Sequence, residues 1–238
     1  MVPILLLIIF VAVFTQSLTG FGSGLVSMSL LPDVLGIRTA VPLVAMMTAT
    51  IELALLIRYR AAFRFGSVWR LVLASMTAIP IGIWALRNLN EHVLLPILGA
   101  IMAGYALYGL FNLKLPRLEH PVWAYLAGFL AGLLSGAYSV GGPPVIIYGN
   151  CRGWDLDEFK SNLQGFFLIN DALALVNHSL VGNLTPLVLK SYLWVLPVIV
   201  LGLFAGTRLD RILNPERFRK LVLFSLVVMG IRLILLAF

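Results

Sequence analysis

The stretches that decide the fold are Gly20-Phe21-Gly22-Ser23-Gly24 and Ser139-Val140-Gly141-Gly142-Pro143-Pro144, each of which interrupts a long hydrophobic segment. Glycine permits left-handed or extended backbone, and proline lacks the N–H group that continues a helix. Both stretches therefore predict a helix break. Broken backbone at membrane depth is tolerated only where it is buried in protein or lines a wet cavity.

The composition places these segments in a membrane. Of the 238 residues, 61% are hydrophobic and 11% are charged, whereas a soluble domain has about 25% charged residues. Most apolar runs are long enough to cross a hydrocarbon core of about 30 Å. We expect an all-α polytopic membrane protein with a retained N-terminal segment and eight hydrophobic segments: 2–31, 39–57, 68–86, 92–111, 121–149, 162–181, 189–206 and 218–237.

The charge and cysteine content exclude several other classes of protein. The net charge of +7 resides in short connections between apolar runs, which fits membrane anchoring and argues against nucleic-acid binding. Cys151 is the only cysteine, and no His/Cys cluster has the spacing of metal ligands. We therefore expect no nucleic-acid partner, no metal and no cofactor.

The two halves of the chain correspond to each other. A shift of 119 positions lays Phe21-Gly22-Ser23-Gly24 on Val140-Gly141-Gly142-Pro143 and Glu52 on Asp171. The identity is thin, but the glycine breaks and an intramembrane acid recur in register. We interpret the chain as two four-segment repeats, 1–119 and 120–238, within one membrane domain.

The distribution of basic residues favours a re-entrant fifth segment. If all eight segments cross, the basic residues divide almost evenly between the two sides. If the fifth segment enters and returns to the same side, thirteen basic residues fall on one side and three on the other. That division satisfies the positive-inside rule. By the repeat, the first segment is also broken or re-entrant, and the two repeats are inverted.

The quoted stretches, together with Gly36-Ile37-Arg38-Thr39-Ala40-Val41-Pro42-Leu43 and Arg152-Gly153-Trp154, resemble the two signature regions of the sulfite exporter TauE/SafE family. The resemblance extends over essentially the whole chain, although Ser23 and Ser29 depart from the family pattern. It implies a multi-pass carrier in the bacterial inner (plasma) membrane that moves sulfite or an organosulfur anion such as a sulfonate. The lipid bilayer is its environment, a homodimer is one option for its assembly, and the direction of transport stays open.

The glycine breaks are the predicted anion site. Backbone N–H groups at a helix N-terminus are unsatisfied and carry about half a positive charge, so they suit an oxyanion. The alternative is that these small residues have no binding role and only let the helices pack closely. The candidate substrate-binding residues are Thr19, Gly22, Ser23, Gly24, Ser135, Ser139, Gly141, Gly142 and Pro143.

Two intramembrane acids, Asp171 and Glu52, are candidates for carrying a coupling proton, since a buried carboxyl usually faces a cavity, pairs or titrates. Glu52 has the alternative of extending to the interface near Arg58. Arg232 is interpreted as an interfacial side chain, with pairing to an acid as its alternative, and His178 as an interfacial histidine.

Two rival functions stay open at this point. A passive anion channel would use the same helix ends, but the intramembrane acids favour a coupled secondary transporter. An intramembrane hydrolase would need Ser139 or Ser135 paired with His178. The chain lacks a G-x-S-x-G motif, and a catalytic serine leaves the first-half break unexplained, so we expect that the protein is not an enzyme.

Overall fold

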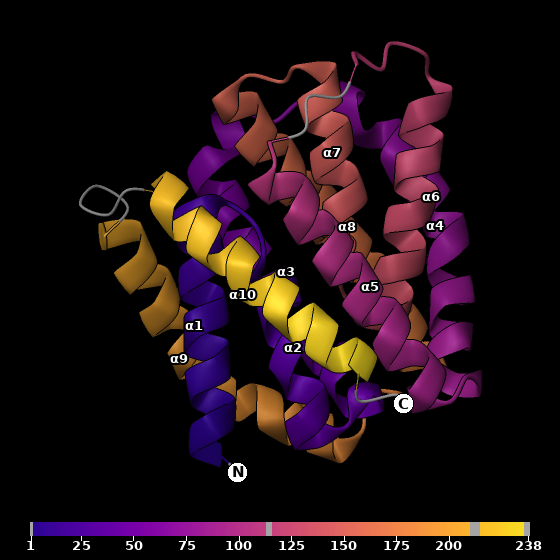
Figure 1. The fold of residues 1–238 in the computed structure, drawn as a ribbon, viewed down its shortest axis with the longest axis vertical. Helices are drawn as coiled ribbons and strands as arrows, with labels where there is room; N and C mark the ends of the chain where they lie inside the picture. The colour runs from indigo at the N-terminus through magenta and orange to yellow at the C-terminus, as the bar shows by residue number, and fades with distance from the viewer. Residues whose placement is uncertain (1, 113–115, 210–214, 236–238) are drawn as a thin grey trace.

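The computed structural model describes residues 2–112, 116–209 and 215–235, and within these ranges every regular element is helical (Figure 1). Lys114 and Arg211, which contributed to the count of basic residues, lie outside the described residues. The elements are α1 (Val2–Thr19), α2 (Ser23–Leu35), α3 (Ile37–Tyr59), the 3₁₀ turn η1 (Arg60–Ala62), α4 (Phe65–Asn88), α5 (Glu91–Leu110), α6 (Val122–Tyr138), α7 (Gly142–Arg152), α8 (Leu156–Leu180), α9 (Pro186–Leu209) and α10 (Pro215–Leu235).

The first and fifth hydrophobic segments are each two helices, α1 with α2 and α6 with α7. Gly22 precedes α2 with φ of 103°, and Ser139 ends α6 with φ of 52°. Both values lie in the left-handed region, which ends a right-handed helix and which glycine adopts without steric cost. The breaks therefore lie where the glycine-rich stretches predict them, and the segments 2–31 and 121–149 are hairpins of helices instead of single rods.

Two sets of connections gather at opposite ends of the molecule. At one end, the Leu118 N–H donates to the Cys151 carbonyl at 3.3 Å, and Ser161 Oγ donates to the Tyr59 carbonyl at 3.0 Å. These bonds bring together the connections after α3, α5 and α7, which carry most of the described connecting arginines, so we call this the basic end (top of Figure 1). At the other end, Arg38 lies beside the Leu89 carbonyl and shares a cavity with Asn183.

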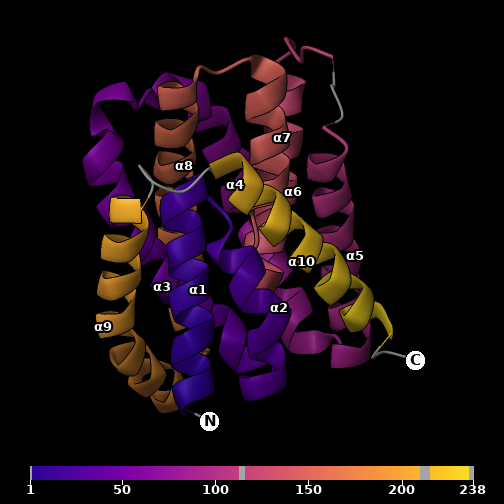
Figure 2. The same ribbon diagram turned by 60° about the vertical axis from the view of Figure 1, so that its left-hand side comes forward.

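Each of the main helix pairs joins a helix of the first half of the chain to a helix of the second half. Helix α4 packs on α6, while α9 packs on α1; α3 packs on α8 and α5 on α10 (Figures 1 and 2). Gly82 of α4 and Gly202 of α9 make equivalent close approaches. A Cβ at Gly82 would lie 2.3 Å from the Leu133 carbonyl oxygen of α6, and one at Gly202 would lie 2.9 Å from the Val13 Cβ of α1.

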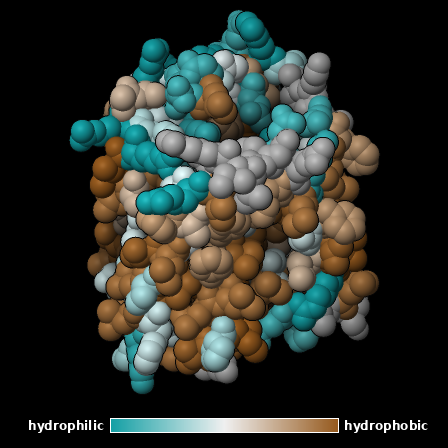
Figure 3. All heavy atoms as spheres, turned by 90° about the vertical axis from the view of Figure 1, so that its left-hand side faces the viewer, coloured by the Kyte–Doolittle hydropathy of each residue, from teal (hydrophilic) through white to brown (hydrophobic). Residues whose placement is uncertain are grey.

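The surface supports membrane residence. Five of the described helices, namely α1, α3 with η1, α4, α5 and α9, are long and apolar enough to cross a bilayer. Large apolar side chains point outward, among them Trp84 at 59% and Phe204 at 58% exposure. Figure 3 shows an apolar band across the face in view, with hydrophilic side chains gathered mainly at the basic end and a smaller group at the opposite end. The chain is therefore a multi-pass helical membrane protein.

Candidate functional site

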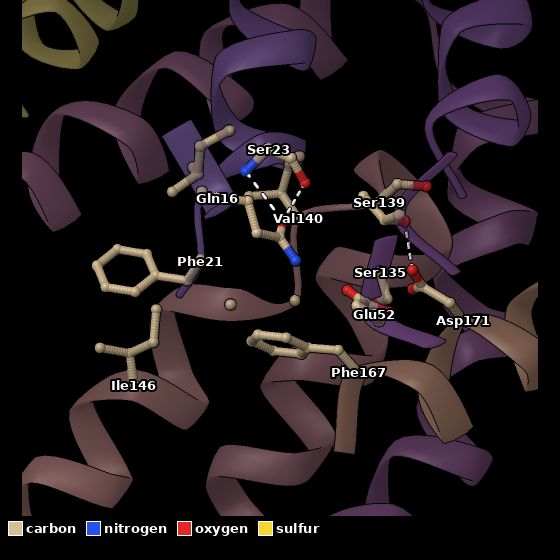
Figure 4. A pocket seen from close by; sticks show the side chains of 16 residues that line it. Gln16, Phe21, Ser23, Glu52, Ser135, Ser139, Val140, Ile146, Phe167 and Asp171 are labelled. Atoms are coloured by element: carbon tan, nitrogen blue, oxygen red, sulfur yellow. Dashed lines mark hydrogen bonds between the residues drawn. The ribbon is translucent and has the colours of Figure 1, made fainter. Parts of the chain in front are cut away.

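A small cavity lies where the two helix breaks meet at the centre of the molecule (Figure 4). Its volume is about 40 Å³, room for a few water-sized groups, since one water needs roughly 10–15 Å³ on this measure. Its lining comes from α1, both hairpin breaks, α3 and α8: Gln16, Phe21, Gly22, Ser23, Gly24, Leu25, Thr48, Glu52, Ser135, Ser139, Val140, Gly141, Gly142, Ile146, Phe167 and Asp171.

The first helix terminus at the cavity is the start of α2. Gly22 caps this helix without a side-chain hydrogen bond, and Ser23 and Gly24 form its first turn. The Ser23 N–H donates to Gln16 Oε1 at 3.2 Å, and the Ser23 hydroxyl donates to the same oxygen. The next N–H group, that of Gly24, has no intrahelical acceptor because it belongs to the first turn. It is a donor suited to an anion in the cavity.

The second helix terminus is the start of α7. Gly141 precedes the helix and Gly142 begins it, followed by Pro143 and Pro144. Since neither proline has an N–H group, Gly141 and Gly142 are the backbone donors that this terminus can offer. The start of α2 lies against the second break, because a Cβ at Gly24 would lie only 2.5 Å from the carbonyl oxygen of Ser139, which ends α6.

Two of the nine predicted binding residues do not line the cavity. Thr19 Oγ1 lies 2.8 Å from the Thr15 carbonyl oxygen and 2.6 Å from the Phe21 carbonyl oxygen, so its hydroxyl is engaged by backbone at the end of α1 and in the first break. Pro143 lines a separate apolar groove between α5, α6 and α7. The other seven candidates do line the cavity, although Ser139 Oγ donates to the Val41 carbonyl at 2.9 Å and Ser135 Oγ accepts from Asn170 at 2.5 Å. Both hydroxyls therefore already have protein partners.

The two intramembrane acids lie together on one side of the cavity. Glu52 of α3 is 4% exposed and Asp171 of α8 is 6% exposed, and their carboxyl groups contact each other. Asp171 also accepts from the hydroxyl of Thr48, while Glu52 Oε2 has no hydrogen-bond partner among the described residues. The alternative in which Glu52 extends to the membrane interface is therefore wrong.

Sequence reasoning missed Gln16 and Thr48. Gln16 is 2% exposed and holds the start of α2, and its Nε2 lies 3.4 Å from Gln164 Oε1. Gln164 in turn donates to the Gly20 carbonyl at 2.5 Å, so this pair of amides fixes both sides of the first break. The available signal was a glutamine inside a strongly apolar helix. It lies four residues before a glycine break, which indicates a polar role at that break.

The electrostatic character of the cavity follows from its lining. Among the described residues that line it, two are acidic and none is Lys, Arg or His. Arg232 lies elsewhere and pairs with Asp33 at 2.5 Å, as its alternative interpretation proposed, with both side chains partly exposed. Within this lining, the positive potential comes from the helix termini.

The Ser/His arrangement of a hydrolase is not present in the described residues. His178 is fully buried, and its Nδ1 lies 2.9 Å from the amide nitrogen of Asn183, in the connection after α8. Its interpretation as an interfacial histidine stays a prediction. The hydroxyls of Ser135 and Ser139 have the partners given above, and neither partner is a histidine. The site offers backbone donors and two carboxyl groups, without a nucleophile joined to a base.

A multi-pass helical fold with broken helices around a buried polar cavity defines a membrane transporter. Comparison with known families agrees: the model of the family described as "Sulfite exporter TauE/SafE" matches residues 5–233. The chain belongs to this family, which is a family of transporters and not of enzymes.

The chain is also similar to a curated protein of a bacterium. The chain is 25% identical over 237 residues to a protein of Cupriavidus necator named "Probable sulfite/organosulfonate exporter TauE", covering 93% of this chain and 89% of the relative. No solved structure matches the chain.

Proposed function

We propose that this protein is a secondary transporter that carries a small sulfur oxyanion, sulfite or the head group of a sulfonate, together with a proton. One observation carries the proposal: the N-termini of α2 and α7 and the carboxyl groups of Glu52 and Asp171 share one buried cavity. The helix termini attract an anion, while the carboxyl groups repel one unless they hold protons.

The sizes of the attractive and repulsive interaction energies favour joint binding of anion and proton. A charge-assisted hydrogen bond from a backbone N–H contributes about 1.5–3 kcal/mol, and a helix terminus adds at most about 2 kcal/mol. A carboxylate about 4 Å from the anion opposes binding by about 4 kcal/mol at an effective dielectric constant of about 20. An ionised acid pair would thus cancel much of the attraction, so the anion binds well only when the pair is protonated. Anion and proton then travel in the same direction, which the two gradients set.

The size of the cavity supports a compact substrate. A volume of about 40 Å³ suits an oxyanion head group, whereas the tail of a longer sulfonate requires the cavity to open. The relative from Cupriavidus necator is named for both sulfite and organosulfonate, and we extend both classes to this chain as candidate substrates.

We further propose that residues 1–119 and 120–238 are inverted repeats whose hairpins, α1–α2 and α6–α7, enter the membrane from opposite sides. The exchanged packing of α4 on α6 and α9 on α1 supports this arrangement. So do the equivalent approaches of Gly82 and Gly202. Rocking of one repeat against the other would open the cavity to each side in turn. The bacterial inner membrane is the proposed location, and a homodimer is the proposed assembly.

A proteoliposome experiment separates this proposal from an anion channel. Purified protein is reconstituted, and uptake of radiolabelled sulfite and of methanesulfonate is measured with and without a pH gradient, acid outside. We expect saturable uptake that the gradient drives to accumulation. Sulfonates keep their charge across neutral pH, so accumulation of methanesulfonate reports a proton carried by the protein. Flux that only dissipates the anion gradient, and that ignores the pH gradient, would identify a channel.

A further inference from the structure

Two of the buried polar atoms that lack hydrogen-bond partners among the described residues are the hydroxyl of Tyr105 on α5 and Nε of Arg219 on α10. Tyr105 is 4% exposed. An unmade hydrogen bond of a buried group costs about 1–3 kcal/mol, so two such donors against one side chain, that of Phe21, indicate a ligand that accepts hydrogen bonds.

Both side chains lie against the ring of Phe21. The guanidinium carbon of Arg219 is 5.7 Å from the centroid of this ring, and the Tyr105 ring meets it edge-on with centroids 6.2 Å apart. Phe21 belongs to the first helix break and lines the central cavity. Figure 4 shows Phe21 on the side of the cavity opposite Glu52 and Asp171. The two donors therefore contact a residue on the side of the cavity away from the acids.

Building on the proposed function, we infer that Arg219 and Tyr105 form a second oxyanion site, separated from the central cavity by the side chain of Phe21. A guanidinium group presents several N–H donors in a plane and binds oxyanions through paired hydrogen bonds, and the phenol adds an O–H donor. Arg219 supplies the positive charge that the described lining of the central cavity lacks. Helix α10 begins in the half of the molecule nearer the basic end, so the second site receives the anion on that side (Figures 1 and 2).

The backbone around Phe21 is suited to a movable barrier between the two sites. Gly20 and Gly22, on either side of it, have φ of 84° and 103°, a region in which other residues are strained. Phe21 is thus the bulky residue of a short connection that glycine allows to turn sharply. Rotation of its ring would join the second site to the central cavity, and the ring in its present position separates them.

Equilibrium binding of radiolabelled sulfite to the purified protein tests this inference. We expect two sites in the unaltered protein and loss of one, or weakening of that one by about tenfold or more, in Arg219→Gln and in Tyr105→Phe. Arg219→Lys, which keeps the charge but not the planar donors, should weaken it less than Arg219→Gln. Arg208→Gln is the matched control, because Arg208 also stacks on a phenylalanine, Phe204, at 4.7 Å but does not contact Phe21. If Arg219→Gln fails to fold, Tyr105→Phe, which removes a single oxygen, carries the test.

The outcomes separate the second site from the proposed function. Two unchanged sites in both Arg219→Gln and Tyr105→Phe, or equal weakening by Arg208→Gln, would overturn the second site and leave the transporter proposal standing. Absence of saturable sulfite binding in the unaltered protein would overturn both. A lipid phosphate offers the same chemistry, so binding is repeated in nanodiscs with and without phosphatidylglycerol. Displacement of the second sulfite by that lipid would assign the site to lipid and overturn its role for the transported anion.

Discussion

The carboxyl groups of Glu52 and Asp171 contact each other at the centre of the molecule, although the two residues lie 119 positions apart in the chain. They occupy matching positions in the two halves, one on α3 and one on α8, and these two helices pack together. Each half thus contributes one helix terminus and one acid to the same cavity. An anion bound there meets both attraction and repulsion, and protonation of the pair decides between them.

The contact between the two breaks predicts a severe effect of Gly24→Ala. The added Cβ would lie 2.5 Å from the Ser139 carbonyl oxygen, so the start of α2 must move away from the second break. We expect sulfite binding in the central cavity to weaken at least about tenfold, corresponding to the loss of one charge-assisted hydrogen bond, as measured by equilibrium binding. Gly66→Ala is the control, because a Cβ there meets nothing within 4 Å. Equal binding by the two variants would show that the termini do not hold the anion.

The packing of α4 on α6 and of α9 on α1 predicts that one substitution in each contact destabilises the protein. Gly82→Ala would press a Cβ against backbone atoms of α6, and Gly202→Ala would press one against Val13 of α1. Both should destabilise the protein by about 1–3 kcal/mol, as overpacking does, and lower the midpoint of thermal unfolding in detergent. Gly104→Ala, in the middle of α5 with open space around it, should leave the midpoint unchanged or raise it, since alanine favours helix. A variant at Gly82 or Gly202 as stable as Gly104→Ala would contradict this packing.

The hydrogen bond between Leu118 and Cys151 predicts the topology of the second hairpin. Cys151→Ser removes the only cysteine, and single cysteines are then placed at Arg117, Arg152 and Arg38. Membrane-impermeant labelling in oriented vesicles should modify positions 117 and 152 from one side and position 38 from the other. Labelling of 117 and 152 from opposite sides would show that the fifth segment crosses the membrane.

The amide network around the first break predicts a role for Gln16. Gln16→Leu leaves the buried N–H and hydroxyl of Ser23 without their acceptor, which should cost about 1–3 kcal/mol of stability. Gln16→Glu keeps an acceptor for Ser23 but adds a third acid to the cavity, so it should weaken sulfite binding more than it lowers stability. Thermal unfolding and equilibrium binding, measured on both variants, check the two effects separately. Unchanged stability in Gln16→Leu would mean that Ser23 finds another acceptor.

The breaks could be predicted from the sequence because they depend on local chemistry. Glycine and proline decide where a membrane helix ends, so the starts of α2 and α7 followed from residues 22–24 and 141–144. The shift of 119 positions places Glu52 and Asp171 at matching positions of the two halves. It does not show that their side chains are in contact. That contact depends on how α3 crosses α8, which is set by packing over both helices.

The errors have a common physical origin in side-chain direction. Successive residues of a helix point about 100° apart, and the orientation of a helix about its axis follows from its neighbours. Thr19 therefore turns back onto its own helix, and Pro143 faces the groove beside α5. Gln16 and Thr48 lie in apolar helices where polarity alone does not reveal whether a side chain faces a cavity.

Coupled uptake by Asp171→Asn is the most direct test of the central claim, that a carboxyl beside the helix termini carries the coupling proton. Proteoliposomes are given a pH gradient, acid outside, and uptake of methanesulfonate and of protons is recorded together. The unaltered protein should accumulate the anion with matching proton entry. Asp171→Asn should lose accumulation and proton entry but keep exchange of internal for external anion. The partly exposed acid variant Asp33→Asn should behave like the unaltered protein. Undiminished proton-driven accumulation in Asp171→Asn would contradict the claim.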